Sequence, residues 1–222
     1  MIAVSIVVPV LDEGPRLAAL LGHFAAWRGA GDELVVVDGG SRDDSLGVAR
    51  AHADIVITAP RGRAAQMNAG AAVAGGRVLW FVHADSDPRA VPRDVVAGCP
   101  AWGRCDVRLD DPAAVFRVIE WLMNRRARLT AIATGDQGLF VTRELFETVG
   151  GFPDFALMED IELSARLRRR ARPLCATGPL LTSARRWRRH GIARTVLLMW
   201  WLRLAWFCGV DDIRLARWYG YR

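Results

Sequence analysis

Short apolar runs alternate with segments of helical character through the first half of the chain. Residues 4–10 form a β-branched run suited to a buried strand, and similar runs recur at 33–37, 55–57 and 78–82. Between them, helical spacing or helix-start residues occur over 16–27, 43–51 and 62–74. This alternation with short connections predicts an α/β fold, with a Rossmann-like, mostly parallel sheet flanked by helices on both faces.

The second half has a less regular pattern. It predicts an edge strand at 102–109, a long helix at 112–131, a strand at 139–142 and a helix at 158–169. Residues 195–210 are apolar except for Arg203, and this segment is shorter than the roughly 20 residues that span a bilayer. We expect a core or amphipathic helix there, with an interfacial helix as the alternative.

The chain shows no linker, internal repeat or low-complexity tract. We therefore expect one domain over residues 1–190. Residues 191–222 are expected to form a Trp-rich helical tail that packs on the domain or on a partner, such as the second copy in a homodimer.

Composition narrows the class of protein. With 222 residues, 52% hydrophobic and 24% charged, the chain is long enough to bury a core and is not globally disordered. The N-terminus has no basic flank typical of a secretory leader, and the four cysteines form no C-x-x-C pair. These features predict a cytoplasmic protein with reduced thiols.

The net charge of +6 comes from thirty basic residues that are all arginine. The lack of lysine excludes Schiff-base chemistry and a Walker A loop. Abundant alanine and arginine are typical of a GC-rich coding sequence, so the positive charge is weak evidence for nucleic acid and we expect no nucleic-acid partner. Ten arginines and one acid fall within residues 161–194, so the positive charge is concentrated in one stretch. A contact with the inner face of a membrane is the alternative for this Arg- and Trp-rich region. G-x-S-x-G, H-E-x-x-H and G-x-G-x-x-G motifs do not occur.

Carboxylates follow three of the predicted strands. Asp12 and Glu13, Asp38, and Asp85 come directly after strands of the first half. Because ligands bind beyond the carboxyl ends of parallel strands, these residues mark the candidate site.

Asp38 and Asp85 each allow two interpretations. Asp38 precedes two glycines, so it either accepts hydrogen bonds from a base or ribose or serves as a turn and cap residue. Asp85 lies in a His-Ala-Asp-Ser-Asp string that can ligate Mg²⁺ or Mn²⁺ together with phosphate oxygens. Asp87 is either a second ligand or a turn residue.

Other candidate residues are basic or lie at a helix start. Arg63 and Asn68, near the start of a predicted helix, suit an anion, with solvated surface charge as the alternative. The cluster 185–190 could hold a diphosphate, an anionic lipid surface or RNA, and His190 is either a metal ligand or structural. Glu159-Asp160 is either catalytic or a helix-capping pair.

Six blocks in this order resemble glycosyltransferase family 2. They are Ser5 to Glu13, Val36 to Asp43, Gly62 to Gly70, His83-Ala84-Asp85, Gly150-Gly151-Phe152 and Glu159 to Ser164. More narrowly, the strings around His83, Thr134–Gln137, Met158–Ser164 and Thr182–Trp187 resemble a branch associated with arsenosugar biosynthesis.

The resemblance implies a GT-A fold and an inverting, hexosyltransferase-type reaction. A sugar would move from a nucleotide-diphospho-sugar to an acceptor hydroxyl, with Mg²⁺ or Mn²⁺ as the cofactor. Asp160, with Glu159 beside it, would be the base, and Asp85, Asp87 and His190 would hold the metal. The donor would contact Pro9, Glu13, Asp38, Gly39, Arg63, Asn68, His83, Ala84 and Arg186. The sugar or acceptor would contact Trp102, Asp136 and Gln137.

The sequence departs from the family at two positions: His83 stands where Asp is frequent, and Asp12 where Asn is common. The first departure puts metal dependence in doubt. Two other functions fit parts of the chain: a sugar-phosphate nucleotidyltransferase, and a non-catalytic module that binds membranes or RNA through the Arg/Trp tail.

Overall fold

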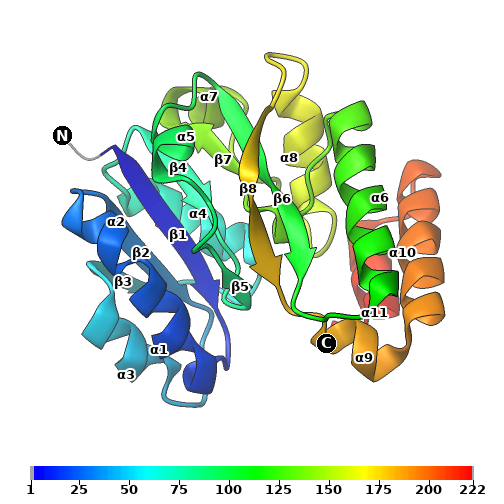
Figure 1. Cartoon of the computed structure of the whole chain (residues 1–222), viewed down its shortest axis with the longest axis horizontal. Coiled ribbons are helices and arrows are strands. Elements are labelled where there is room, and N and C mark those ends of the chain that lie inside the picture. Colours follow the sequence, from blue (N-terminus) through cyan, green and yellow to red (C-terminus); the bar gives the residue numbers. More distant parts are fainter. Residues whose placement is uncertain (1–2, 222) are drawn as a thin grey trace.

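The computed structural model of the protein describes residues 3–221, in which eight strands form one mixed sheet (Figure 1). The strands are β1 (Val4–Val10), β2 (Glu33–Asp38), β3 (Ile55–Thr58), β4 (Val78–Phe81), β5 (Ser86–Asp87), β6 (Trp102–Leu109), β7 (Phe140–Thr142) and β8 (Leu174–Thr182). Their order is β3-β2-β1-β4-β7-β6-β8-β5. β1 to β4 are parallel, whereas β7 runs antiparallel to β4 and β6. The predicted α/β fold is confirmed.

Helices cover both faces of this sheet. They are α1 (Gly14–His23), α2 (Ala25–Gly29), α3 (Ser45–His52), α4 (Arg63–Val73), α5 (Arg93–Ala97), α6 (Ala114–Thr130), the 3-10 turn η1 (Gly135–Gln137), α7 (Arg143–Thr148), α8 (Glu159–Leu167), α9 (Arg185–His190), α10 (Ile192–Phe207) and α11 (Asp212–Tyr219). Apolar residues of α1, α2, α3 and α5 share one core cluster with the sheet. Those of α4, α7 and α8 share another on the opposite face.

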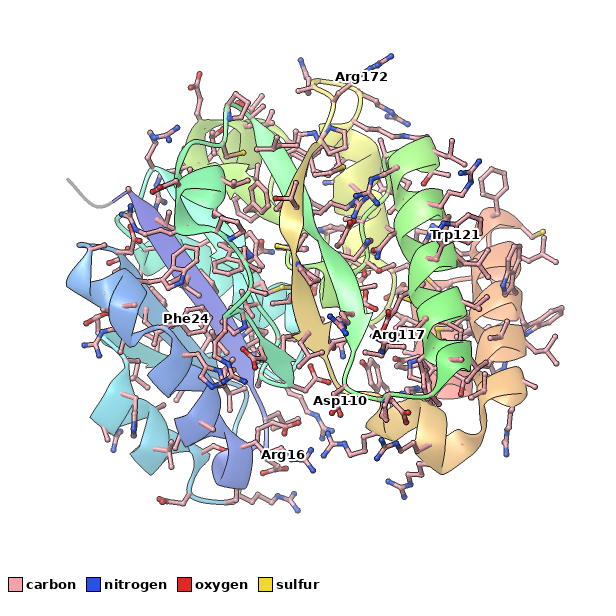
Figure 2. All side chains as sticks on the ribbon, viewed as in Figure 1. Arg16, Phe24, Asp110, Arg117, Trp121 and Arg172 are labelled. Atoms are coloured by element: carbon pink, nitrogen blue, oxygen red, sulfur yellow. The ribbon has the colours of Figure 1, made fainter. Side chains whose placement is uncertain are left out.

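The alternation of β1 explains how one strand serves both clusters. Ile6 and Val8 belong to the cluster under α1, where Phe24, labelled in Figure 2, is fully buried. Val7, between them, belongs to the cluster under α4. α4 lies so close to the strands that a Cβ on Gly70 would approach Val7 to 2.5 Å. This contact fixes the start of α4 near the carboxyl ends of β1 and β2.

The candidate residues predicted at strand ends share one edge of the molecule. Because β1, β2 and β4 are parallel, Asp12, Asp38 and Asp85 follow them at the same edge. Figure 2 shows Arg16 of α1 and Asp110, which follows β6, at this lower edge. The fold therefore places both halves of the chain around one candidate site.

Three expectations about the elements were wrong. β6 is an interior strand between β7 and β8, not an edge strand. β8 was not predicted, because Gly178 and Pro179 interrupt its apolar pattern and a bulge shifts its register against β6. The helical segment 16–27 is divided into α1 and α2 at Phe24.

The C-terminal helices pack on the domain. Leu202 of α10 and Leu215 of α11 share a buried cluster with Leu157 and Met158, which precede α8. The outer side of α10 carries exposed apolar side chains, among them Trp200 and Phe207, which are 73% and 92% exposed. Within residues 3–221, no helix combines the length and apolar character that crossing a bilayer requires.

Candidate active site

Asp38, the last residue of β2, is held by the turn that follows it. Its carboxylate is only 3% exposed, and Oδ2 accepts hydrogen bonds from the backbone N–H groups of Gly40 (2.9 Å) and Ser41 (3.0 Å). Oδ1 is buried and has no hydrogen-bond partner within residues 3–221. Since an unsatisfied buried carboxylate oxygen is costly, Oδ1 is suited to accept a hydrogen bond from a ligand.

Gln66 of α4, which the sequence did not single out, supports this turn. Its Nε2 donates to the carbonyl oxygens of Val10 (2.9 Å) and Val37 (2.8 Å), and so joins the ends of β1 and β2. A Cβ on Gly39 would come within 2.9 Å of the Gln66 side chain, so the turn needs a residue without one. A glutamine within an alanine-rich predicted helix was the only signal in the sequence, and its burial became visible only in the structure.

His83 follows β4 and packs against the loop that leads to η1. A Cβ on Gly135 would lie 2.3 Å from His83 Cε1, so only glycine permits this approach. Burial, reinforced by the positive charge of Arg63, lowers the pKa of His83 to about 3. The imidazole is therefore neutral at physiological pH, and Ala84 beside it is buried.

Two adjacent carboxylates open α8 directly beside this loop. Asp160 Oδ2 accepts a hydrogen bond from the backbone N–H of Gly135 (2.6 Å), and Oδ1 accepts one from Ile161 (2.7 Å). Glu159 is 4% exposed, and burial together with the charge of Asp160 raises its pKa to about 7. Burial also raises the pKa of Asp160. Carboxylates with raised pKa values suit proton transfer near neutral pH.

The backbone is strained where these carboxylates begin. Met158, which caps α8, has a φ of 74°, and Asp12, after β1, has a φ of 54°. Side-chain-bearing residues rarely adopt this left-handed region, and such residues cluster at functional sites. Both outliers adjoin the edge that holds the acidic residues.

Arg63, the first residue of α4, lies among the acidic residues. Its charge lowers the pKa of Asp85, Glu159 and Asp160 against the raising effect of burial. Its guanidinium lies 5.7 Å from the ring centroid of Tyr221. No sequence pattern indicates that the end of the chain reaches this arginine, because only the tertiary fold brings the two together.

A second arginine makes a similar contact with the C-terminal segment. The Arg186 guanidinium lies 3.6 Å from the ring centroid of Tyr219 and donates to its carbonyl oxygen (2.9 Å). Its neighbour Arg185 lies 3.7 Å from Glu13, whose pKa is raised by burial and by the charge of Asp85. Residues from both ends of the chain thus surround Asp85.

Asp85 is the site's best candidate for a metal ligand. Within residues 3–221 its exposed carboxylate has no side-chain hydrogen bond or ion pair. Crowding by the surrounding protein, with the charge of Asp136, raises its pKa. A cation would relieve this repulsion, so the site fits a metal held by one protein carboxylate and ligand phosphates. The described residues contain no cluster of three His, Cys, Asp or Glu side chains arranged for a metal.

The other predicted metal ligands do not join Asp85. The Asp87 carboxylate pairs with Arg89 (2.5 Å) and contacts His23 (3.4 Å) of α1, so its charge is already neutralised. His190 is exposed at the end of α9. The described residues therefore do not bring Asp87 and His190 together with Asp85, which stays a predicted metal ligand.

Three predicted ligand-binding residues have structural roles instead. Trp102 is fully buried in the core and donates to the carbonyl oxygen of Ala171 (2.8 Å). The buried Gln137 accepts a hydrogen bond from the backbone N–H of Thr134 (3.1 Å). Asn68 uses both ends of its amide on Phe152, at 2.8 and 3.0 Å. Trp102 and Gln137 are therefore corrected from substrate contacts, and Asn68 from a donor contact, to positioning residues.

Asp136 remains at the site. It accepts a hydrogen bond from Thr134 Oγ1, and its charge acts on both Asp85 and Asp160. Pro9 lies partly buried near the end of β1, beside the β2 strand that carries Asp38. One edge of the sheet thus carries charged residues that could bind a charged ligand and move a proton. They are Asp38, Arg63, Asp85, Asp136, Glu159 and Asp160.

Comparison with known proteins shows what part of the chain and its fold are similar to. Residues 5–89 match the family model described as Glycosyl transferase family 2. This range includes Asp38 and Asp85 and ends before the carboxylates of α8. None of the curated proteins matches the chain.

Solved glycosyltransferase structures share the fold. A mannosyltransferase from Pyrobaculum calidifontis, in complex with GDP-Man and Mn²⁺, is 23% identical, with a TM-score of 0.59 over 82% of this chain and 56% of its own. TarS 1–349 of S. aureus is 16% identical, with a TM-score of 0.63 over 83% of this chain and 61% of its own. The chain thus spans about three fifths of these two structures.

A third structure shows the same architecture. Glucosyl-3-phosphoglycerate synthase of Mycobacterium tuberculosis, in complex with Mn²⁺, UDP and glucosyl-3-phosphoglycerate, is 19% identical. Its TM-score is 0.56, over 81% of this chain and 71% of its own. The chain has a GT-A fold.

Proposed function

We propose that the protein is an inverting glycosyltransferase that moves a sugar from a nucleotide-diphospho-sugar to an acceptor hydroxyl. The observation that carries this proposal is the buried Glu159–Asp160 pair, which lies with raised pKa values beside Arg63 and the Gly135 loop. The family model over residues 5–89 supports glycosyl transfer over nucleotidyl transfer.

The donor would lie along the strand ends. Oδ1 of Asp38 would accept a hydrogen bond from the nucleoside, with Pro9 and Glu13 beside it. Arg63, Arg185 and Arg186 would neutralise the diphosphate, which gains charge as it leaves. His83, Ala84 and Gly39 would shape the wall without adding charge.

Asp85 would hold Mg²⁺ or Mn²⁺ together with the diphosphate. When bound, the metal supplies positive charge to the leaving group. Two related folds were solved with Mn²⁺ beside GDP-Man or UDP, which supports a divalent ion here.

Asp160 would act as the general base. As the acceptor oxygen bonds to the anomeric carbon, the bond from that carbon to the diphosphate breaks, and the hydroxyl proton passes to Asp160. Attack opposite the leaving group gives inversion in one displacement. The Gly135 N–H, 2.6 Å from Oδ2, orients the carboxylate for this step.

The narrower resemblance supports a role in arsenosugar or related glycoside biosynthesis. It rests on the strings around His83, Thr134–Gln137, Met158–Ser164 and Thr182–Trp187. Product analysis with candidate acceptors tests this assignment.

We also propose that α6 and α10 make a peripheral contact with a membrane. The enzyme would then work at the inner face of that membrane. The two helices expose a set of large apolar side chains, called here the apolar face: Trp121, Leu122, Leu129, Leu197, Trp200, Trp201, Leu204 and Phe207. Arg125 stacks over Trp121 (5.4 Å), and Arg194 is exposed on α10. Aromatic and basic side chains together suit an anionic lipid surface. A homodimer contact through the same face is the alternative.

Calorimetric titration of UDP, GDP and dTDP, with and without Mn²⁺, tests the proposed activity. We expect one nucleotide to bind in a Mn²⁺-dependent way, and Asp85→Ala to weaken that binding at least tenfold. Asp87→Ala is the matched control, because its carboxylate faces Arg89 and should leave the metal effect intact. If no nucleotide binds under either condition, the proposal is wrong.

A further inference from the structure

Two arginines beside Asp160 have no partner for their charge. Arg126 of α6 and Arg203 of α10 are partly buried, and Figure 1 shows their helices on the same side of the molecule. Within residues 3–221 neither guanidinium has a hydrogen bond or ion pair. Nε and Nη2 of Arg126, and Nη2 of Arg203, are buried without a partner.

Among residues 3–221, Arg104 and Arg117 also bury an Nε without a partner, but unlike Arg126 and Arg203 they form ion pairs. Arg104 pairs with Asp106 (2.9 Å) and donates to two carbonyl oxygens. Arg143 donates to three carbonyl oxygens near the end of α4. Since burying an unpaired charge is costly, Arg126 and Arg203 differ from this pattern in a way that core packing does not explain.

The two charges also oppose each other. Burial, reinforced by the nearby charge of Arg203, lowers the pKa of Arg126 to about 10, and burial lowers the pKa of Arg203 as well. Two like charges held together in a partly desolvated place are stabilised when an anion lies between them.

The nearest acids do not fill this role. Asp136 and Asp160 are close enough for their charges to act on both arginines, yet neither forms an ion pair with them. Asp160 is held by Gly135 and Ile161, and Asp136 accepts from Thr134. The buried donors of both arginines therefore have no partner among the described residues.

Position separates this pair from the donor side of the site. The charges of Arg63 and Arg185 lower the pKa of Asp85. Arg126 and Arg203 instead lie close enough to Asp136 and Asp160 for these acids to raise the pKa of both arginines. Asp160 lies between the two groups, because Arg63 also acts on it. An anion on Arg126 and Arg203 would thus lie close to Asp136 and Asp160.

We propose that Arg126 and Arg203 bind a phosphate or carboxylate group of the acceptor, so that the acceptor's hydroxyl faces Asp160. Planar guanidinium groups bind both anions in a two-pronged way. The inference rests on the proposed function and adds the substrate class: a hydroxylated acceptor with an anionic group.

The test uses three probes on the full chain with its tightest-binding nucleoside diphosphate and Mn²⁺ at saturation. Glycerol 3-phosphate and glycerate each combine a hydroxyl with one of the two anions, and glycerol is the neutral probe. We expect at least one anionic probe to bind and glycerol not to bind. Arg126→Met and Arg203→Met should each weaken that binding roughly ten- to a hundredfold.

Arg125→Met is the matched control. Arg125 is next to Arg126 in the sequence, but its side chain is exposed and stacks over Trp121. It should keep full anion binding. The melting temperature is the second readout: removing an unpaired buried charge should raise it or leave it unchanged, whereas loss of a structural contact would lower it.

Two results would overturn the inference: no anionic probe binding to the wild type, or equal binding by the wild type and both Met variants. Nucleotide binding is recorded in the same titrations and separates the two claims. Intact nucleotide binding without anion binding refutes only the acceptor site. Anion binding without any nucleotide binding refutes the proposed transferase and the acceptor role, and leaves only an anion site at Arg126 and Arg203.

Discussion

At the scale of single residues, the site depends on carboxylates held in surroundings that disfavour their charge. Glu159 is buried next to Asp160, and Asp85 is crowded beside Asp136. Each raised pKa means that the folded state holds the proton more tightly than the unfolded chain does. Stability gained in this way is fully present at low pH and is lost as the pH rises through the folded-state pKa.

Glu159→Gln tests how much stability the protein loses when the buried Glu159 is ionised. We expect the variant to be more stable than the wild type at pH 8, by at most about 3 kcal/mol, because the glutamine carries no charge to bury. The difference should disappear as the pH falls below 4.5, the ordinary pKa of glutamate, because Glu159 then becomes protonated in both states. Thermal unfolding across this range measures it, with the exposed Glu144→Gln on α7 as control. Equal curves for wild type and variant at every pH would contradict the expectation.

Gly135 provides a second prediction at this scale. In Gly135→Ala, the new Cβ would lie 2.3 Å from His83 Cε1, so the loop must shift and Asp160 loses its N–H donor geometry. We expect a loss of stability of about 1–3 kcal/mol and slower hydrolysis of the donor.

Replacing the clashing ring as well should restore much of this stability. The double variant His83→Ala/Gly135→Ala is therefore expected to be more stable than the sum of the single effects, as a double-mutant cycle in chemical denaturation measures. Strictly additive effects would show that the two residues are not in contact.

At the scale of elements, long-range clamps set the geometry of the site. Gln66 joins the ends of β1 and β2, and Asn68 joins α4 to the turn at Phe152 that leads toward α8. α4 thus links the strand that carries Asp38 to the segment before Glu159 and Asp160. The close packing of α4 on β1 at Gly70 fixes both connections.

Asn68→Ala separates positioning from binding. We expect nucleotide affinity to change by less than about threefold, and donor hydrolysis to fall about tenfold or more, because the start of α8 is no longer held. Asn68→Asp keeps the acceptor for the Phe152 N–H and should recover part of the rate. An equal loss of nucleotide affinity and rate in Asn68→Ala would instead place Asn68 at the donor.

The elements also show what the sequence could predict. The strands β1 to β4 were predictable because each is an apolar run with a polar or acidic residue at its end or within two residues after it. β8 was hidden because Gly178, which approaches the Ala90 carbonyl so closely that a Cβ would lie at 1.9 Å, and Pro179 break its pattern. Such a constraint comes from a distant partner, which local periodicity does not contain.

The same distinction applies to the site. Strand-end acids were predictable, because topology alone brings Asp38 and Asp85 to one edge. The roles of Asn68 and Trp102 were wrong, because residue type does not reveal which atoms a side chain contacts. The unpaired Arg126 and Arg203 come from helices far apart in the sequence, so only the tertiary structure shows them.

At the scale of the whole molecule, the fold leaves the apolar face on α6 and α10 uncovered within residues 3–221. Exposed apolar area of this kind marks an interaction surface. We expect flotation with anionic vesicles to retain the wild type, and neutral vesicles to retain less of it.

Trp200→Gln/Phe207→Gln should abolish retention by the vesicles without changing nucleotide binding, since both side chains are more than 70% exposed. A concentration-dependent dimer that the same substitutions dissociate, without lipid retention, would assign the face to a second copy of the chain.

The free Oδ1 of Asp38 has a consequence for nucleobase choice. A carboxylate oxygen accepts but does not donate, so it favours a base whose pairing edge presents a ring N–H. Uracil, thymine and guanine have that N–H, whereas the corresponding ring nitrogen of cytosine is an acceptor and would be repelled. CDP should therefore bind at least tenfold more weakly than UDP, GDP or dTDP, whichever of these binds most tightly. Asp38→Asn, whose amide can donate, should reduce that difference. The polarity of one atom at the end of β2 would then set which family of activated sugars enters the site.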